Sequence, residues 1–162
     1  MTDQEEREQQ LMQLVGFTIG NEQFGVDILM VQEIIRSAPI TSVPNSPDFI
    51  EGVINLRGNI IPVIELRKRL NLFREGSDSD DSWILILDIN GRVTGFIVDS
   101  VTRVLKIMEN TIEPPPEVVV AGLANQYIRG VCDIGESLLI LLDFNRILMA
   151  DELRQLKAIN GE

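Results

Sequence analysis

The chain contains an internal duplication, and this feature strongly limits the folds that it can adopt. Residues 52–70, GVINLRGNIIPVIELRKRL, align without a gap with residues 130–148, GVCDIGESLLILLDFNRIL, at a shift of 130 − 52 = 78 residues. Few letters are identical, but the chemical classes coincide, and a shared pattern specifies a shared local structure. The sequence therefore predicts two similar folding units. The matched columns are Val53 with Val131, Asn55 with Asp133, Ile61 with Leu139, Ile64 with Leu142, Glu65 with Asp143, Leu66 with Phe144 and Leu70 with Leu148.

A second match lies upstream in each copy. Residues 24–27, FGVD, correspond to residues 96–99, FIVD, at a shift of 96 − 24 = 72 residues, so the loops between the matched segments differ in length. Two copies are too few for a solenoid, which needs about three stacked repeats. Because β-branched runs alternate with turn signals, we predict a mainly β fold built as a duplicated small barrel or sheet.

Turn and cap signals divide the chain into short elements. Turns are expected at Gly20–Asn21, Arg57–Asn59 and Asn90–Gly91, each between two apolar runs. Pro62 has no N–H, which indicates an edge or a bulge, and Asp27 is placed to cap a short helical turn. An exchange of the chain ends between two barrels is compatible with the pattern. The predicted segments are an acidic tail (1–10), a first barrel (about 11–74), a linker (about 75–82), a second barrel (about 83–150) and a final helix (151–162).

The composition argues against several classes of partner. With 14 basic and 25 acidic residues the formal net charge is −11, and phosphate backbones and anionic lipid surfaces repel such a chain. No apolar run approaches the roughly 18 residues of a spanning helix, and residues 1–10 do not resemble a secretory signal. The single cysteine, Cys132, is read as a small buried apolar residue in a reducing compartment. We expect a cytoplasmic protein that binds no nucleic acid and does not insert into the membrane.

The sequence lacks the residues on which most catalytic and metal sites depend. It contains no histidine, the usual general base and the commonest metal ligand. Glu65 and Asp143 are conceivable as paired carboxylates, but each is better explained as the residue that ends a strand and caps the following helix. The acidic run at residues 78–81 lacks the central glycine and closing glutamate of a calcium loop. We therefore expect no enzyme activity, no metal and no cofactor.

Four segments, in this order and spacing, resemble the CheW family of chemotaxis coupling proteins. The resemblance covers about residues 11–148, and the INLRG-x-I-x-P-V pattern at residues 54–63 is a specific signature of CheW-like domains. From the length of the chain we expect no receiver domain after this region, as in CheV-type proteins, and no kinase before it, as in CheA. The four segments are FGVDILMVQEII (24–35), FIEGVINLRGNIIPVIELRKRL (49–70), VTGFIVDSVTRVL (93–105) and LLILLDFNRIL (138–148).

The resemblance implies both an architecture and a function. The implied fold is two packed five-stranded barrels of the SH3-like type with short helices and a C-terminal helix. The implied function is that of a non-catalytic adaptor, which binds the regulatory domain of the histidine kinase CheA and the cytoplasmic tip of methyl-accepting chemoreceptors. Such proteins bridge the two partners in signalling arrays at the membrane.

The resemblance also implies a receptor-binding groove between the barrels. The matching positions are Ile28, Val31, Gln32 and Glu33, where an amphipathic receptor helix would bury an apolar stripe while rim charges set its register. Arg57 matches an arginine characteristic of the family, and we predict that it pairs with Glu33. A short apolar run is equally typical of core residues, so Ile28 and Val31 could serve only packing.

A kinase-binding surface is implied at one end of each barrel. Glu113 stands where some relatives carry a basic residue, and Val118 stands where some carry an aromatic one, which argues against ring packing with the kinase. The three prolines at residues 114–116 are also compatible with a stiff crossover that has no partner. The matching positions are Val43 and Ile60 in the first barrel and Ile112, Glu113, Glu117 and Val118 in the second.

Two other functions are compatible with the sequence. A CheW-like coupler of a type IV pilus or gliding system would use the same surfaces, so the sequence does not separate it from a chemotaxis coupler. A small-ligand-binding barrel protein would instead need convergent polar groups in a closed pocket.

Overall fold

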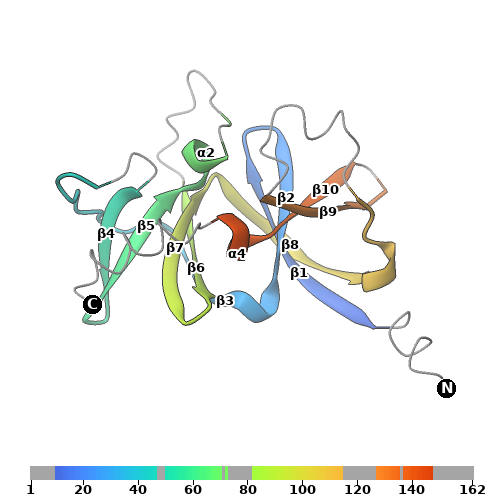
Figure 1. Ribbon diagram of the computed structural model, residues 1–162, viewed down its shortest axis with the longest axis horizontal. Helices are drawn as coiled ribbons and strands as arrows, with labels where there is room; N and C mark the ends of the chain where they lie inside the picture. Colours follow the sequence, from blue (N-terminus) through green and yellow to red (C-terminus); the bar gives the residue numbers. More distant parts are fainter. Residues whose placement is uncertain are drawn as a thin grey trace.

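The computed structural model describes residues 10–46, 50–70, 72, 82–114, 127–135 and 137–147. Its strands form two five-stranded sheets, which curl into barrels that lie side by side (Figure 1). Barrel A has the strand order β8-β1-β2-β10-β9, and barrel B has the order β3-β6-β7-β5-β4. The predicted mainly β fold of two small five-stranded barrels is thereby confirmed.

Each barrel is assembled from short strands joined by hairpins and single helical turns. Barrel A contains β1 (Leu11–Ile19), β2 (Glu22–Asp27), β8 (Ser100–Met108), β9 (Ile128–Asp133) and β10 (Leu138–Leu142). Barrel B contains β3 (Val31–Ile35), β4 (Ile50–Leu56), β5 (Asn59–Glu65), β6 (Trp83–Ile89) and β7 (Arg92–Val98). The helical turns are η1 (Ile28–Met30), α2 (Leu66–Arg69), η2 (Glu109–Thr111) and α4 (Phe144–Ile147).

The two copies of the repeat exchange their first hairpins. The sheets do not follow the predicted division into 11–74 and 83–150, because β1 and β2 join β8–β10 whereas β6 and β7 join β3–β5. In Figure 1 the blue β1 and β2 accordingly lie beside the orange β9 and β10, away from the green β4 and β5. The chain crosses between barrels at η1 and at Asp99. Similar strands are interchangeable as neighbours, so the repeat did not reveal which copy supplies each hairpin.

Strand register shows that the duplication is structural. Val53 of β4 faces Pro62 of β5, and their counterparts at a shift of 78 residues, Val131 of β9 and Ile140 of β10, also face each other. Strand β2 pairs in parallel with β10, and its counterpart β7 pairs in parallel with β5. The predicted turns are also present, with Asn90 at φ 53° and Gly91 at φ 82° between β6 and β7. These positive φ values match the turn type that follows the twist of a hairpin.

Pro62 lies at a position of β5 that has no pairing partner on β7, so its missing N–H costs no hydrogen bond to β7. It faces Val53 of β4, and the pairing of β5 with β7 begins only at Val63, one residue later. The prediction of an edge or bulge at Pro62 therefore agrees with an unpaired stretch of β5 on the β7 side.

Several strands are buried on both faces because the barrels share a core. On β6, Leu85 and Leu87 enter the core between the barrels, whereas Ile84 and Ile86 fill the interior of barrel B. On β10 the alternation repeats, with Leu139 and Leu141 inside barrel A. Burial on both faces explains why these strands are continuous apolar runs. Cys132 is buried in the barrel A interior, as predicted, and burial raises the pKa of its thiol.

Aromatic rings occupy the middle of the shared core. The ring of Phe144, on α4, lies 4.9 Å from that of Phe96 in an edge-to-face arrangement and 6.5 Å from that of Phe17. Phe17 in turn stacks on Phe24 at 5.7 Å. All four side chains are fully buried, so one cluster joins residues from both barrels and both copies of the repeat.

Both barrels are closed by an isolated antiparallel bridge of two backbone hydrogen bonds. In barrel B the segment after β3 returns to β4, where Thr41 and Val53 exchange two backbone hydrogen bonds of 2.9 Å. In barrel A, Glu113 and Val131 exchange the equivalent bonds at 3.0 and 2.8 Å. A glycine precedes each valine, since a side chain at that position would collide with the returning segment.

The ends of β5 and β10 carry the predicted helix caps. Glu65 accepts a hydrogen bond from the Arg67 N–H at 3.4 Å, and Asp143 accepts one from the Asn145 N–H at 3.1 Å. Asp27 likewise accepts from the Leu29 N–H at 3.0 Å, at the start of η1. All three cap predictions are confirmed.

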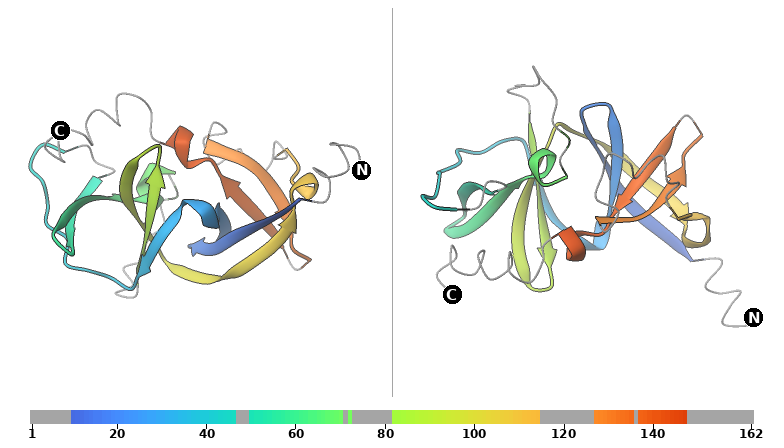
Figure 2. Two further views of the ribbon diagram at one scale, coloured as in Figure 1. Left: turned by 90° about the horizontal axis from the view of Figure 1, so that it is seen from below. Right: turned by 45° about the horizontal axis from the view of Figure 1, so that its top comes forward.

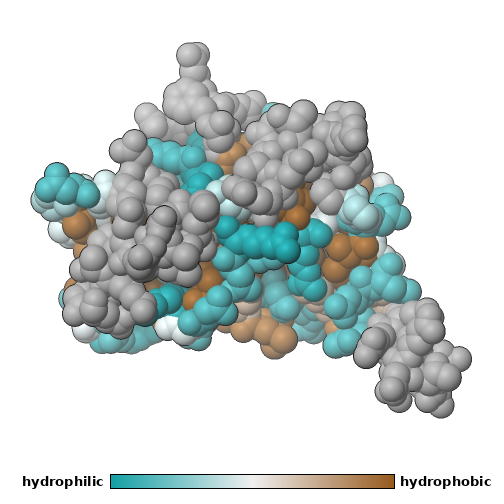
Figure 3. Space-filling model, in the orientation of Figure 1, coloured by the Kyte–Doolittle hydropathy of each residue, from teal (hydrophilic) through white to brown (hydrophobic). Residues whose placement is uncertain are grey.

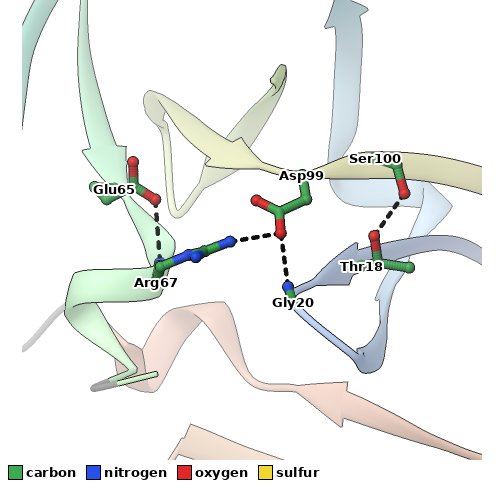
Figure 4. Close-up of polar contacts among 6 residues, drawn as sticks. All are labelled: Thr18, Gly20, Glu65, Arg67, Asp99 and Ser100. Atoms are coloured by element: carbon green, nitrogen blue, oxygen red, sulfur yellow. Dashed lines mark hydrogen bonds and ion pairs between the residues drawn. The ribbon is translucent and has the colours of Figure 1, made fainter. Parts of the chain in front are cut away.

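Asp99, at the second crossover, contacts both barrels (Figure 4). Its carboxylate accepts the Gly20 N–H of the β1–β2 turn at 2.6 Å and pairs with Arg67 of α2 at 2.5 Å. Beside it, the hydroxyls of Thr18 and Ser100 are 2.5 Å apart. These polar contacts fasten the crossover at the edge of the shared apolar core.

Some predicted segments lie outside the described residues. They are the tail at residues 1–9, residues 75–81 of the linker and the C-terminal helix at 151–162. In the described part of the chain, no helix has the length and apolar character needed to cross a membrane.

Candidate protein-binding surface

A surface hollow of about 490 Å³ lies at one end of barrel B. It is bordered by the edge strand β3, the β4–β5 turn and the β6–β7 turn. It brings together Gln32, Glu33 and Arg57, which were predicted for receptor binding, with Ile60, which was predicted for kinase binding. The structure thus places residues from the two predicted surfaces around one hollow.

An ion pair spans this hollow. Arg57 Nη1 donates to Glu33 Oε1 at 3.1 Å, and Arg57 Nη2 contacts the other carboxylate oxygen, so the contact is bidentate. The hydrogen bond from Arg57 lowers the pKa of Glu33. The predicted pair is confirmed. Because β3 is one edge of the barrel B sheet and Arg57 directly follows β4, the other edge, the pair links the two edges of the sheet.

The backbone of Arg57 is in an unusual conformation for a residue with a side chain. Its φ is 52°, in the left-handed region that favours glycine. Asn55 supports the turn by accepting the Gly58 N–H at 2.9 Å. The guanidinium at this turn is 71% exposed.

Ile28 and Val31 lie between the barrels. Both side chains are half-buried and pack against the shared core, so they contribute to packing and still present part of their surface. Ile28 also lines a second hollow, of about 360 Å³, beside Leu11 and Leu29. Leu29 is 88% exposed and was not singled out from the sequence, although its place beside Ile28 in a capped turn was a usable signal.

The predicted kinase-binding residues are distributed over both barrels. Ile60 is 51% exposed, whereas Val43 is half-buried, and its carbonyl accepts the Ser46 hydroxyl at 2.9 Å. Ile112 is half-buried against the barrel A interior, and Glu113 is exposed at the closing bridge. Glu117 and Val118 lie outside the described residues.

The repeat points to one exposed residue that the sequence predictions missed. Leu138 occupies the column of Ile60, at the start of β10, and is 45% exposed. Exposed apolar side chains are otherwise scattered. On the face seen in Figure 3, the described residues show several separate hydrophobic areas among hydrophilic ones, with no single broad patch.

The carboxylates Glu65 and Asp143 are each engaged as a helix cap rather than paired with one another. Burial raises the pKa of Glu65, while its hydrogen bond with Arg67 acts in the opposite direction. Among the described residues, no group of three or more carboxylate or thiol side chains is placed to hold a metal ion.

The sequence is similar to known chemotaxis proteins over most of its length. Residues 13–152 match the family model of the CheW-like domain. The chain is 43% identical to a chemotaxis protein CheW of Klebsiella aerogenes over 85% of this chain and 81% of the relative. It is 36% identical to a chemotaxis protein CheW of Treponema pallidum over 89% of this chain and 86% of the relative.

A solved structure shows the same fold. The scaffolding protein TtCheW from Thermoanaerobacter tengcongensis superposes with a TM-score of 0.79 at 38% sequence identity. The superposition covers 88% of this chain and 91% of that chain.

Proposed function

This chain belongs to the CheW-like family of chemotaxis scaffold proteins, and from that membership we propose that it is a non-catalytic adaptor that couples chemoreceptors to the histidine kinase CheA. In this proposal the protein acts in the cytoplasm and is recruited to receptor arrays at the membrane. The observation that carries the proposal is the family match over residues 13–152. The hollow formed by Gln32, Glu33, Arg57 and Ile60 supplies a surface suited to protein partners.

The receptor contact is proposed for the surface from Ile28 to Glu33, with Arg57 at its border. An amphipathic helix could place apolar residues on Ile28 and Val31 and polar ones near the Glu33–Arg57 pair. Apolar contacts would supply most of the affinity, and the charges at the rim would select the orientation.

Replacement of Arg57 by glycine tests the receptor contact without straining the fold. Glycine adopts the positive φ of this turn freely, so the midpoint of urea unfolding should stay constant or rise. Loss of the guanidinium should weaken binding of a receptor-tip fragment by about tenfold, as expected for a charged contact at an interface. Binding is to be measured by isothermal titration calorimetry. If the folded variant binds the receptor fragment with unchanged affinity, Arg57 is not part of the receptor-binding surface.

Replacement of Ile60 by aspartate tests the kinase contact. A carboxylate in the middle of an apolar interface should weaken binding of the CheA regulatory domain by at least about tenfold. Because Ile60 is 51% exposed, the fold should tolerate the charge. The matched control is Leu11→Asp in barrel A, where the native side chain is 61% exposed. Equal losses in the two variants would contradict a kinase surface at Ile60.

Two alternatives are separated by other measurements. A pull-down that recovers pilus or gliding components together with their receptor and kinase would favour a CheW-like coupler of those systems. A small-ligand-binding barrel is disfavoured because apolar side chains fill the interiors of both barrels. A turnover assay over hydrolase and phosphatase substrates should give no product.

A further inference from the structure

The helical turn α2 lies at the seam where the two barrels meet, and two of its basic side chains contact residues outside barrel B. Arg67 pairs with Asp99, at the second crossover, at 2.5 Å. Arg69 Nε donates to the Ile147 carbonyl of α4 at 3.0 Å, and its guanidinium carbon lies 4.6 Å from the centre of the Tyr127 ring, directly before β9. With the top of the molecule turned forward, α2 (green) lies between the barrels, close to the start of β8 (yellow) (Figure 2, right). We call these contacts of Arg67 and Arg69 the α2 clasp.

The ion pair of the clasp is less exposed than the ion pair beside it. Lys68, the residue between the two arginines, pairs with Glu51 of β4, so that contact stays within barrel B. The Lys68 side chain is 55% exposed, whereas that of Arg67 is 13% exposed. An exposed ion pair contributes little to stability, but removing one partner of a buried pair leaves the other charge uncompensated. The contact at the seam is therefore the more demanding of the two in its geometry.

The repeat does not reproduce the clasp at the first crossover. Asp27 occupies the column of Asp99 (99 − 72 = 27), and Asn145 occupies the column of Arg67 (67 + 78 = 145). Asparagine carries no charge, so this pair of columns forms an ion pair in one place and not in the other. The Asp27 carboxylate instead accepts the Leu29 N–H within its own turn. The first crossover thus has a local cap where the second has contacts to both barrels.

The surface proposed for the receptor begins at the other end of the seam. In Figure 1, α2 is at the top, and the blue segment that leads through η1 to β3 is at the bottom. Ile28 starts η1 and Val31 starts β3, and both pack against the core that the barrels share. Their placement therefore depends on the angle between the barrels. Apolar contacts in the core are non-directional, whereas charge-assisted hydrogen bonds hold their partners in a narrow range of geometries.

We infer that the α2 clasp sets the angle between the barrels and thereby positions Ile28 and Val31 for the receptor helix. This inference rests on the receptor-coupling function proposed above. In it, Arg67 and Arg69 are positioning residues, which act through the relative placement of the barrels and do not touch the partner. The clasp is at one end of the seam, so its loss changes the opening at the other end most.

The first test compares two neighbouring residues of α2. Arg67→Gln and Lys68→Gln each remove one positive charge, but only the first breaks a contact of the clasp. Residual dipolar couplings of the backbone amides report how each N–H bond is oriented relative to a common frame. One alignment tensor should fit both sheets in the unaltered protein and in Lys68→Gln, whereas Arg67→Gln should need a different tensor for each barrel. A single tensor in all three proteins would overturn the inference.

Asp99→Asn approaches the same contact from its other partner, and it serves if Arg67→Gln does not fold. Asparagine has the same shape and keeps an oxygen that can accept the Gly20 N–H, which Asp99 accepts at 2.6 Å. It removes the charge that faces Arg67. Asp99→Asn should therefore also need two tensors, and adding it to Arg67→Gln should have no further effect, since paired residues are not additive. A common tensor in Asp99→Asn would contradict the clasp.

The second test measures binding by isothermal titration calorimetry. Arg67→Gln should weaken binding of the receptor-tip fragment about fivefold, the scale on which residues remote from a site alter its affinity. Binding of the CheA regulatory domain should be unchanged, because its proposed contact at Ile60 lies on barrel B alone. Lys68→Gln should change neither affinity. Equal losses for both partners in Arg67→Gln would indicate a general loss of folded structure and overturn the positioning role.

The two tests also separate this inference from the proposed function. If the unaltered protein does not bind the receptor fragment, the proposed function is wrong, and the dipolar couplings alone decide whether the clasp sets the angle between the barrels. If the unaltered protein binds the fragment and Arg67→Gln binds it equally well, the proposed function stands and the positioning role of the clasp is wrong.

Discussion

Replacement of Gly52 by alanine should destabilise the folded protein by roughly 3 kcal/mol or more. Losses of this size arise when a substitution combines an unfavourable backbone conformation with a steric clash. The φ of Gly52 is 154°, a value that residues with side chains rarely adopt. An added Cβ would lie 2.9 Å from Ile40 Cγ2 and closer still to the carbonyl oxygen of Thr41. The variant must therefore break the Thr41–Val53 bridge that closes barrel B. Urea unfolding, followed by the fluorescence of Trp83, measures the loss.

Gly58→Ala is the matched control for this prediction. Gly58 also has a positive φ, of 88°, but a Cβ there would have no neighbour within 4 Å. Its replacement should cost only the conformational penalty, about 1 kcal/mol. If Gly52→Ala is no less stable than Gly58→Ala, the close approach of the Thr41 backbone is not the reason why residue 52 is a glycine. Gly130→Ala should resemble Gly52→Ala, since its Cβ would lie 2.8 Å from the carbonyl oxygen of Glu113.

Replacement of Phe144 by alanine should cost about 3 to 5 kcal/mol, because it opens a cavity in the shared core. Phe144 is 1% exposed and contacts the rings of Phe96 and Phe17, which belong to different barrels. We expect both barrels to lose stability together in one cooperative transition. Trp83 fluorescence reports on barrel B, and hydrogen exchange of the β9 amides reports on barrel A.

The control for the core prediction is Leu138→Ala. Leu138 starts β10 of barrel A but is 45% exposed, so its truncation should cost less than about 1 kcal/mol. Two separate transitions in Phe144→Ala, with barrel B unchanged, would show that the barrels fold independently and that the shared core does not couple them.

Local features of the fold were predictable from the sequence because neighbouring residues determine them. The turn at Asn90–Gly91 needs positive φ at successive residues, and this requirement is visible in the residue types. The caps at Asp27, Glu65 and Asp143 depend on a carboxylate placed just before a helical turn. Pairing between Arg57 and Glu33 was predicted through the family resemblance, because the two residues are 24 positions apart in the sequence.

The surfaces were predicted less completely. The sequence separated Ile60 from Gln32 and Glu33, whereas the structure places them around one hollow, because the curvature of barrel B brings the β4–β5 turn to β3. Leu138 was missed although the repeat alignment places it in the column of Ile60.

The order of residues along the chain was enough to predict a duplicated, mainly β protein, because periodicity, turn residues and the repeat are local or directly comparable between segments. The CheW type followed from the resemblance of four segments to a known family. The exchange of the first hairpins, and the single apolar core that joins the barrels, became visible only in three dimensions. Equivalent strands offer the same backbone edge and the same apolar face to a neighbour. The choice between them therefore depends on connection lengths and on packing in space, neither of which the repeat specifies.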